Sequence, residues 1–205
     1  MLFIAEKLDN LQRYTTDSEQ LMIINNVSWQ LYENLLADLE DNSYLRITYI
    51  NGILEIMSPS RRHEFIKTNI GRLVEVYLEE TRTRFYGLGS TTFRQETVAR
   101  GIEPDECYCI NSEKIVPDIA IEVIVTSGGI NSLEVYKGLK IPEVWFWDND
   151  FSLYWLDNEN YQAVTTSRFL PLLDLSLLAE YVISPEPMEA VIEFRQKIRE
   201  QIQKS

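Results

Sequence analysis

Apolar residues follow two spacings along the chain, one typical of helices and the other typical of strands. The longest helical pattern covers residues 61–82, where one side of the predicted helix carries Ile66, Ile70, Leu73, Val74 and Tyr77. A shorter one follows Ser28, which stands at the position of a helix N-cap and precedes leucines at helical spacing. Further helices are predicted at about residues 130–139, 174–182 and 186–203.

Short apolar runs bounded by turn residues predict the strands. The clearest pair is a hairpin in which residues 45–50 and 53–57 flank Asn51-Gly52, a dipeptide that tolerates positive φ at both central turn positions. Residues 117–125 are a further predicted strand, and its part from residue 119 to residue 125 is apolar on both faces apart from Glu122, which is typical of a central strand covered on both sides. The other predicted strands lie at about residues 21–24, 84–88, 91–98, 105–110, 143–147, 152–155 and 161–164.

The order of these elements predicts the fold class. Strand, helix and strand follow one another between residues 117 and 147, as in a right-handed crossover, so we expect a mixed sheet. The predicted class is α/β, with a mixed central sheet flanked by helices, an extra strand and helix on the N-terminal side, and C-terminal helices. We expect an N-terminal arm over residues 1–19, one compact domain over residues 20–183 and a C-terminal helix over residues 184–205.

Composition excludes several classes of function. The 205 residues are 45% hydrophobic and contain no run near the roughly 20 apolar residues of a membrane helix. The apolar start of the chain is too short for a secretory signal, so we expect a cytoplasmic protein without membrane contact. One histidine, His63, and two cysteines exclude multi-histidine sites and the usual zinc quartets. The glycine pairs lack the spacing of a nucleotide loop, so no nucleotide cofactor is expected.

The charge balance bears on nucleic-acid binding. Lys and Arg number 19 against 32 Asp and Glu, which gives a net charge of −13. Affinity for DNA comes from neutralising phosphates, so a chain this acidic needs a local basic strip to bind it. Arginines are scattered around the positions discussed next, where they either meet a phosphate backbone or only balance the acids: Arg61, Arg62, Arg82, Arg84, Arg94 and Arg100.

Glu122 is the residue whose position most needs an explanation. A carboxylate inside an apolar strand is costly unless a cation, a metal or several hydrogen bonds receive it. Asp105 opens the preceding strand, and the loop after that strand is long enough to fold one strand back beside the other, bringing Asp105 close to Glu122. Two converging carboxylates suit a hard divalent cation such as Mg²⁺ or Mn²⁺. Asp118 is the rival, but it lies about 13 Å from Glu122 along one strand, at about 3.3 Å per residue.

Simpler interpretations of these residues remain open. An Asp after Pro, such as Asp105, is often only turn chemistry, and Glu122 could be neutralised by a buried arginine or lysine. His63 stands near the start of the long helix, where it is either a capping or surface group or a residue that contacts phosphate or acts as a base. Cys107 and Cys109 point to the same face of a strand and are expected in the core as free thiols.

Several short motifs run in the order of a known family. They lie at residues 51–60 with His63, and at residues 89–94, 103–108, 117–123, 127–129 and 142–147. Over about residues 20–180 the chain therefore resembles the large bacterial family of restriction endonucleases of the Uma-two type, long catalogued as a domain of unknown function. That family is placed in the PD-(D/E)XK nuclease superfamily, so the resemblance implies a restriction-endonuclease-like core and a DNA substrate.

The resemblance also implies roles for particular residues. Asp105 would be the first metal-binding Asp, Glu122 the acidic residue of the (D/E)XK half, and Glu55 a neighbour of the same site on the second hairpin strand. In the superfamily a lysine two residues beyond the second acid orients the attacking water, but Ile124 stands there. In some relatives the lysine comes from the next helix, about one turn before a Tyr, and this chain has Ser132 at that place.

Two hypotheses follow from the sequence. The first is a metal-dependent DNA endonuclease in which Asp105 and Glu122 hold Mg²⁺ or Mn²⁺, working as a homodimer because double-strand cleavage needs two sites. The second is a catalytically silent binding or interaction module on the same scaffold. The pair of acids favours the first, whereas the missing lysine and the acidic charge favour the second.

Overall fold

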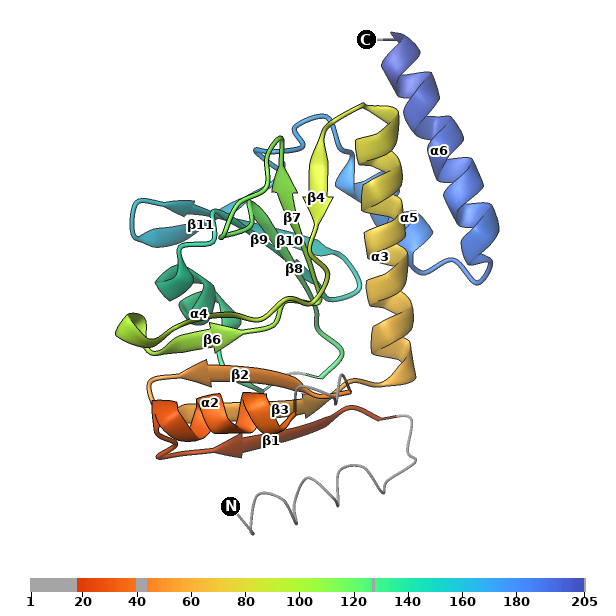
Figure 1. The fold of residues 1–205 in the computed structure, drawn as a ribbon. Coiled ribbons are helices and arrows are strands. Elements are labelled where there is room, and N and C mark those ends of the chain that lie inside the picture. The colour runs from red at the N-terminus through yellow and green to blue at the C-terminus, as the bar shows by residue number, and fades with distance from the viewer. Residues whose placement is uncertain (1–17, 40–43, 127, 205) are drawn as a thin grey trace.

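A computed structural model of the chain describes residues 18–39, 44–126 and 128–204. Within these residues the chain forms two sheets and five helices (Figure 1). The predicted N-terminal arm, residues 1–19, therefore lies outside the described residues except for its last two positions. None of the described helices is long and apolar enough to cross a membrane.

Sheet A has five strands and contains the predicted hairpin. Its order is β1-β3-β2-β6-β5, all antiparallel, with β1 at Gln20–Ile24, β2 at Arg46–Ile50, β3 at Ile53–Ser58, β5 at Phe93–Gln95 and β6 at Arg100–Ile102. Asn51 and Gly52 have φ values of 47° and 86°, as the turn requires. Helix α2, at Trp29–Asp38, begins at Ser28, whose Oγ accepts the Leu31 N–H, and packs its apolar side on this sheet.

Sheet B has six strands and is mixed, as predicted. Its order is β11-β10-β9-β8-β7-β4, with β4 at Phe85–Gly87, β7 at Glu106–Ile110, β8 at Ile119–Val123, β9 at Glu143–Trp147, β10 at Phe151–Asp157 and β11 at Asn160–Val164. Strands β8 and β9 are parallel, and α4, at Ser132–Leu139, connects them. The other pairs in the sheet are antiparallel.

Helices cover both faces of sheet B. On one face lie α3 at Arg61–Glu80, α5 at Leu175–Val182 and α6 at Pro187–Lys204, and on the other lies α4 (Figure 1). In the central strand β8, Ile119, Ile121 and Val123 pack in the core beneath α3, whereas Ala120 packs beneath α4. Side chains alternate along a strand, so Glu122 is on the α4 face with Ala120. Cys107 and Cys109 are buried and free, as predicted.

The one region that differs in kind from the predicted elements is residues 91–102. The predicted strand at 91–98 is only β5 followed by a short 3-10 turn, and the chain then reverses through Ala99, whose φ is 50°. The sequence does not indicate strand β6, because the strand is only three residues long and its middle residue is Gly101, a residue type that is depleted in strands. Gly101 is needed there, since a Cβ at that position would lie 2.0 Å from the Tyr32 hydroxyl oxygen.

Candidate active site

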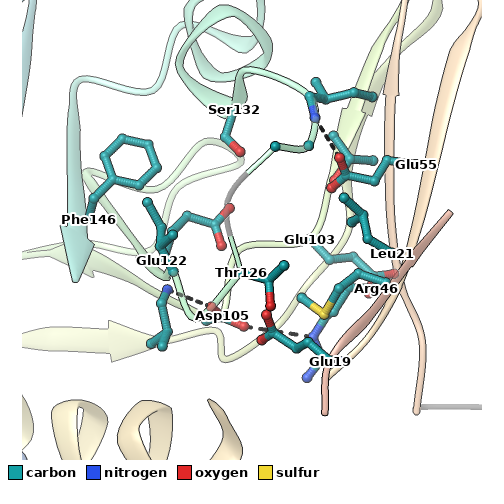
Figure 2. A pocket seen from close by; sticks show the side chains of 17 residues that line it. Glu19, Leu21, Arg46, Glu55, Glu103, Asp105, Glu122, Thr126, Ser132 and Phe146 are labelled. Atoms are coloured by element: carbon teal, nitrogen blue, oxygen red, sulfur yellow. Dashed lines mark hydrogen bonds and ion pairs between the residues drawn. The ribbon is translucent and has the colours of Figure 1, made fainter. Parts of the chain in front are cut away.

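A cavity of about 260 Å³ lies where sheet A faces the ends of β7 and β8 and the start of α4 (Figure 2). Five acidic residues line it, namely Glu19, Glu55, Glu103, Asp105 and Glu122. Arg46 is the single basic residue among the lining side chains. Leu21, Met57, Ile124, Ile130 and Phe146 supply most of its apolar wall. The cavity therefore brings acidic side chains together in a partly apolar setting.

Strand pairing brings Asp105 and Glu122 together. Strands β7 and β8 pair with Glu106 opposite Ile121 and Cys107 opposite Ala120. Continued by one residue, this antiparallel register puts Asp105 opposite Glu122, on the same face of the sheet. Directly opposite residues have Cβ atoms about 4.5–5.5 Å apart. Figure 2 shows the two carboxylates side by side at the cavity.

Asp105 is held by groups from two other elements. Its side chain is 2% exposed; Oδ2 accepts the Val123 N–H at 2.8 Å, and Oδ1 lies 2.8 Å from Nε2 of His63. Nε of Arg46 lies 3.9 Å from the same Oδ1 atom. These partners come from β8, α3 and β2, so local turn chemistry does not explain Asp105.

Within the described residues, Glu122 accepts a hydrogen bond from a hydroxyl group but forms no ion pair. The Tyr136 O–H of α4 donates to its Oε1 atom. Burial, followed by the charge of Asp105, raises the pKa of Glu122 well above its ordinary value. The predicted alternative, a salt bridge to a buried arginine or lysine, is therefore not found in this part of the chain. A cation bound between the carboxyl groups of Asp105 and Glu122 would stabilise the ionised form of Glu122.

His63 is buried between two carboxylates and is not a surface group, so that interpretation was wrong. It is 0% exposed; Nδ1 lies 2.6 Å from Oε1 of Glu19 and Nε2 lies 2.8 Å from Oδ1 of Asp105. Burial alone would lower its pKa, but the hydrogen bonds to Asp105 and Glu19 outweigh burial and raise it to about 10. Its capping contact uses the backbone only, since the His63 N–H donates to Oγ of Ser60 at 3.1 Å.

Glu55 faces the same cavity from sheet A. Its Oε2 atom accepts the Ile130 N–H at 2.5 Å, in the segment that leads into α4, and burial raises its pKa. A Cβ on Gly129 would lie 2.2 Å from the same Oε2 atom, so this carboxylate rests directly on the backbone. The three residues singled out by the sequence, Glu55, Asp105 and Glu122, thus line one cavity.

Asp118, the rival carboxylate, lies at the far end of β8. Its Oδ2 atom accepts the Ile110 N–H at 2.7 Å and pairs with Nζ of Lys114 at 2.5 Å. Its own N–H donates to the Tyr108 carbonyl. These contacts stabilise the turn between β7 and β8, and Asp118 does not line the cavity.

Among the described residues, no lysine lines the cavity. Ile124 and Ser132, the two positions where a lysine would be expected from the superfamily pattern, both line it. Lys137 pairs with Glu134, with its Nζ 2.8 Å from Oε2, and Lys140 ends α4 with a φ of 59°. Among the described residues that line the cavity, the positively charged side chain is that of Arg46.

The residues present fit an oxygen-ligated divalent ion. Among the described residues, no group of three or more His, Cys, Asp or Glu side chains is arranged to hold a metal. Mg²⁺ nevertheless binds through one or two carboxylates and retains several waters. Asp105 and Glu122 are such a pair, and they open on a cavity large enough for water.

Sequence reasoning missed three residues that complete the site. Arg46 carried a signal, because it is charged within a predicted strand that is otherwise mostly apolar. Tyr136 is the tyrosine that follows Ser132 by about one helical turn, and the sequence gives no sign that its hydroxyl contacts Glu122. Glu19 carried no signal, since its contact with His63 joins residues far apart in the sequence.

The fold agrees with a comparison to known protein families. The chain has a mixed α/β fold of the restriction-endonuclease-like class, as the motifs implied. A sequence model of the family described as "Uma2: Putative restriction endonuclease" matches residues 29–186, which is more than half of the chain. The chain therefore belongs to this family, and the predicted resemblance is confirmed. No curated protein matches it.

Proposed function

We propose that this protein is a divalent-metal-dependent endonuclease that hydrolyses DNA phosphodiester bonds, with Mg²⁺ or Mn²⁺ held by Asp105 and Glu122. The observation that carries the proposal is that Asp105, directly before β7, and Glu122, on β8, both line one cavity. The raised pKa of Glu122 supports it, because a bound cation would favour the ionised form that burial and the charge of Asp105 now disfavour.

The charge of the cavity supports the need for a metal. Those of its five acidic residues that are ionised would repel a phosphodiester, and Arg46 is the one arginine or lysine among the described residues that line it. A divalent ion, when bound, lowers the pKa of a water ligand and stabilises charge on a phosphate under attack. The protein's own part is to hold the two carboxylates in place, with the Tyr136 hydroxyl orienting Glu122 and Arg46 positioned to contact a phosphate oxygen.

We also propose that the enzyme is a homodimer that works in the cytoplasm. A two-fold dimer supplies the two sites that double-strand cleavage needs. The hairpin of β10 and β11 places Tyr154, Trp155 and Tyr161 at an edge of sheet B, and aromatic side chains are enriched at interfaces. Free cysteines, as at Cys107 and Cys109, are usual in a reducing compartment. Light scattering would test the dimer, and a monomeric mass would contradict it.

Calorimetric titration with Mn²⁺ tests the metal site, and plasmid nicking tests the chemistry. Wild type should bind Mn²⁺ and nick plasmid, whereas Glu122→Gln and Asp105→Asn should lose both. Asp118→Asn is the matched control, because Asp118 also follows proline and directly precedes β8 but does not line the cavity. It should keep both properties. Equal Mn²⁺ binding by all four proteins, or none by the wild type, would refute the proposal.

A second function, a non-cleaving binding module, is favoured by the absence of a lysine from the side chains that line the cavity. In that case wild type binds Mn²⁺ and DNA without nicking. Ser132→Lys then discriminates, because Ser132 is the first residue of α4 and its hydroxyl faces the cavity (Figure 2). Gain of nicking by Ser132→Lys, but not by Lys140→Ser, would identify a scaffold that lacks only this group.

A further inference from the structure

We propose that His63 is a positioning residue that fixes the carboxylate of Asp105 for metal binding, and that Glu19 holds His63 in turn. This inference rests on the proposed function, since it assigns the outer support of that same metal site. The residues form a continuous chain from Glu19 before β1, through His63 in the first turn of α3, to Asp105 before β7.

The geometry of His63 leaves it little freedom. Both ring nitrogens face carboxylate oxygens, at 2.6 Å on the Glu19 side and 2.8 Å on the Asp105 side. Neither carboxylate, when ionised, can donate a hydrogen bond, so both contacts require the ring to donate from both nitrogens as an imidazolium. The backbone of His63 is fixed as well, because its N–H donates to the N-cap Ser60.

Asp105 is thereby held at both of its oxygens. His63 engages Oδ1, and the Val123 N–H of β8 engages Oδ2. A carboxylate oxygen has two lone pairs, so a donor on each oxygen still leaves capacity to bind a cation. Donors of this kind fix the orientation of a metal-binding side chain, and their loss typically weakens metal affinity about 10–100-fold.

Glu19 extends this support to the edge of sheet A. Its side chain is 4% exposed and lines the cavity just before β1, the edge strand of that sheet. The pair of Glu19 and His63 therefore connects sheet A, α3 and the strand end that carries Asp105. A residue needed only for core packing would not place both ring nitrogens within hydrogen-bond distance of carboxylate oxygens.

Substitutions at His63 can separate its two contacts. The amide nitrogen of glutamine reaches about as far as Nε2, so His63→Gln can keep the donor to Asp105 and lose the contact with Glu19. The amide nitrogen of asparagine reaches about as far as Nδ1, so His63→Asn does the reverse. The matched pair differs by one methylene and has no charge in either member.

The test is the affinity for Mn²⁺ alone, measured calorimetrically, with a thermal unfolding curve of each metal-free protein. We expect His63→Gln to bind within about threefold of wild type, and His63→Asn and His63→Ala to bind about 10–100-fold more weakly. Equal affinities for His63→Gln and His63→Asn would overturn the inference while the wild-type affinity still supports the metal site. If wild type binds no Mn²⁺, the proposed function fails and this inference fails with it.

A milder pair of variants covers the case in which substitution of His63 prevents folding. Glu19→Gln keeps an acceptor for Nδ1 and should bind Mn²⁺ nearly as wild type does. Glu19→Ala removes that acceptor and should weaken binding several-fold, because the imidazole is then held from one side only. Wild-type affinity in both Glu19 variants would contradict the role given to Glu19.

Discussion

Two consecutive acidic residues at the start of β7, Asp105 just before the strand and Glu106 within it, lie in opposite surroundings. On the cavity face, Asp105 is surrounded by donors, namely His63, the Val123 N–H and the nearby Arg46. On the face beneath α3, Glu106 is half-buried, and burial raises its pKa to about 7, with the charges of Glu75, Asp105 and Glu64 adding to this and Lys67 opposing it. The cavity side therefore surrounds Asp105 with hydrogen-bond donors, whereas the side beneath α3 leaves Glu106 half-buried with a raised pKa.

The largest expected effect is the loss of the Asp105 acceptor. Asp105→Ala leaves the buried His63 and the Val123 N–H without their partner, which should lower the free energy of unfolding by about 3–5 kcal/mol. Glu106→Ala, the matched change on the other face, should cost less than about 1 kcal/mol, because removing the costly charge offsets the lost contacts. Urea unfolding at pH 7.5 measures both values. Equal losses would break the comparison between the faces.

The next effect is a fall in stability with rising pH caused by His63. Its pKa is raised from 6.5 to about 10 in the folded chain, so its contribution is fully present below about pH 6.5 and is lost as the pH rises through about 10. Between pH 6.5 and 8.5 the free energy of unfolding should fall by about 2 kcal/mol. His63→Gln serves as the control, since its stability should lack this part of the slope. Parallel pH profiles for the two proteins would contradict the buried imidazolium.

Glu106 should give a smaller effect with a different pH window. Its pKa is raised from 4.5 to about 7 by folding, so the folded state is penalised as the pH rises from about 4.5 through about 7. Glu106→Gln should therefore stabilise the protein by about 1–2 kcal/mol at pH 8, a reduced value because the side chain is partly exposed to water. It should have little effect at pH 4.5. Thermal unfolding at the two pH values measures this. Destabilisation at pH 8 would show that the carboxylate has a favourable role.

The smallest expected effect concerns two glycines that lie against carboxylates, Gly129 against Glu55 at the cavity and Gly71 against Glu106 beneath α3. A Cβ at Gly129 would lie 2.2 Å from Oε2 of Glu55, so Gly129→Ala should displace this side chain from the Ile130 N–H and cost about 1 kcal/mol. A Cβ at Gly71 would lie 3.2 Å from Oε1 of Glu106, and alanine gains about 1 kcal/mol in a helix, so Gly71→Ala should be near neutral. Chemical denaturation measures both. In a Glu55→Ala background Gly129→Ala should lose most of its cost, and a persistent cost would contradict this account.

Local patterns were sufficient for most of the secondary structure. The hairpin around Asn51-Gly52, the N-cap Ser28 and the long helix α3 depend on residues close in sequence, and the structure has all three. Strand β6 was not predicted, because Arg100-Gly-Ile102 has no periodicity and is a strand only through its partners. Its pairing with β2 and β5 also creates sheet A as a separate sheet, where a single central sheet was expected.

The sequence by itself determined that a carboxylate would stand in an apolar central strand, and that Asp105 would open the strand before it. It also determined that the residue two positions after Glu122 is not a lysine but Ile124. All of these are properties of residues close together in the sequence. Only the tertiary structure decided which groups surround the two acids. His63, Glu19, Arg46 and Tyr136 reach them from α3, the segment before β1, β2 and α4. Such contacts join distant parts of the chain, and the energy of a buried charge depends on those neighbours rather than on its sequence context.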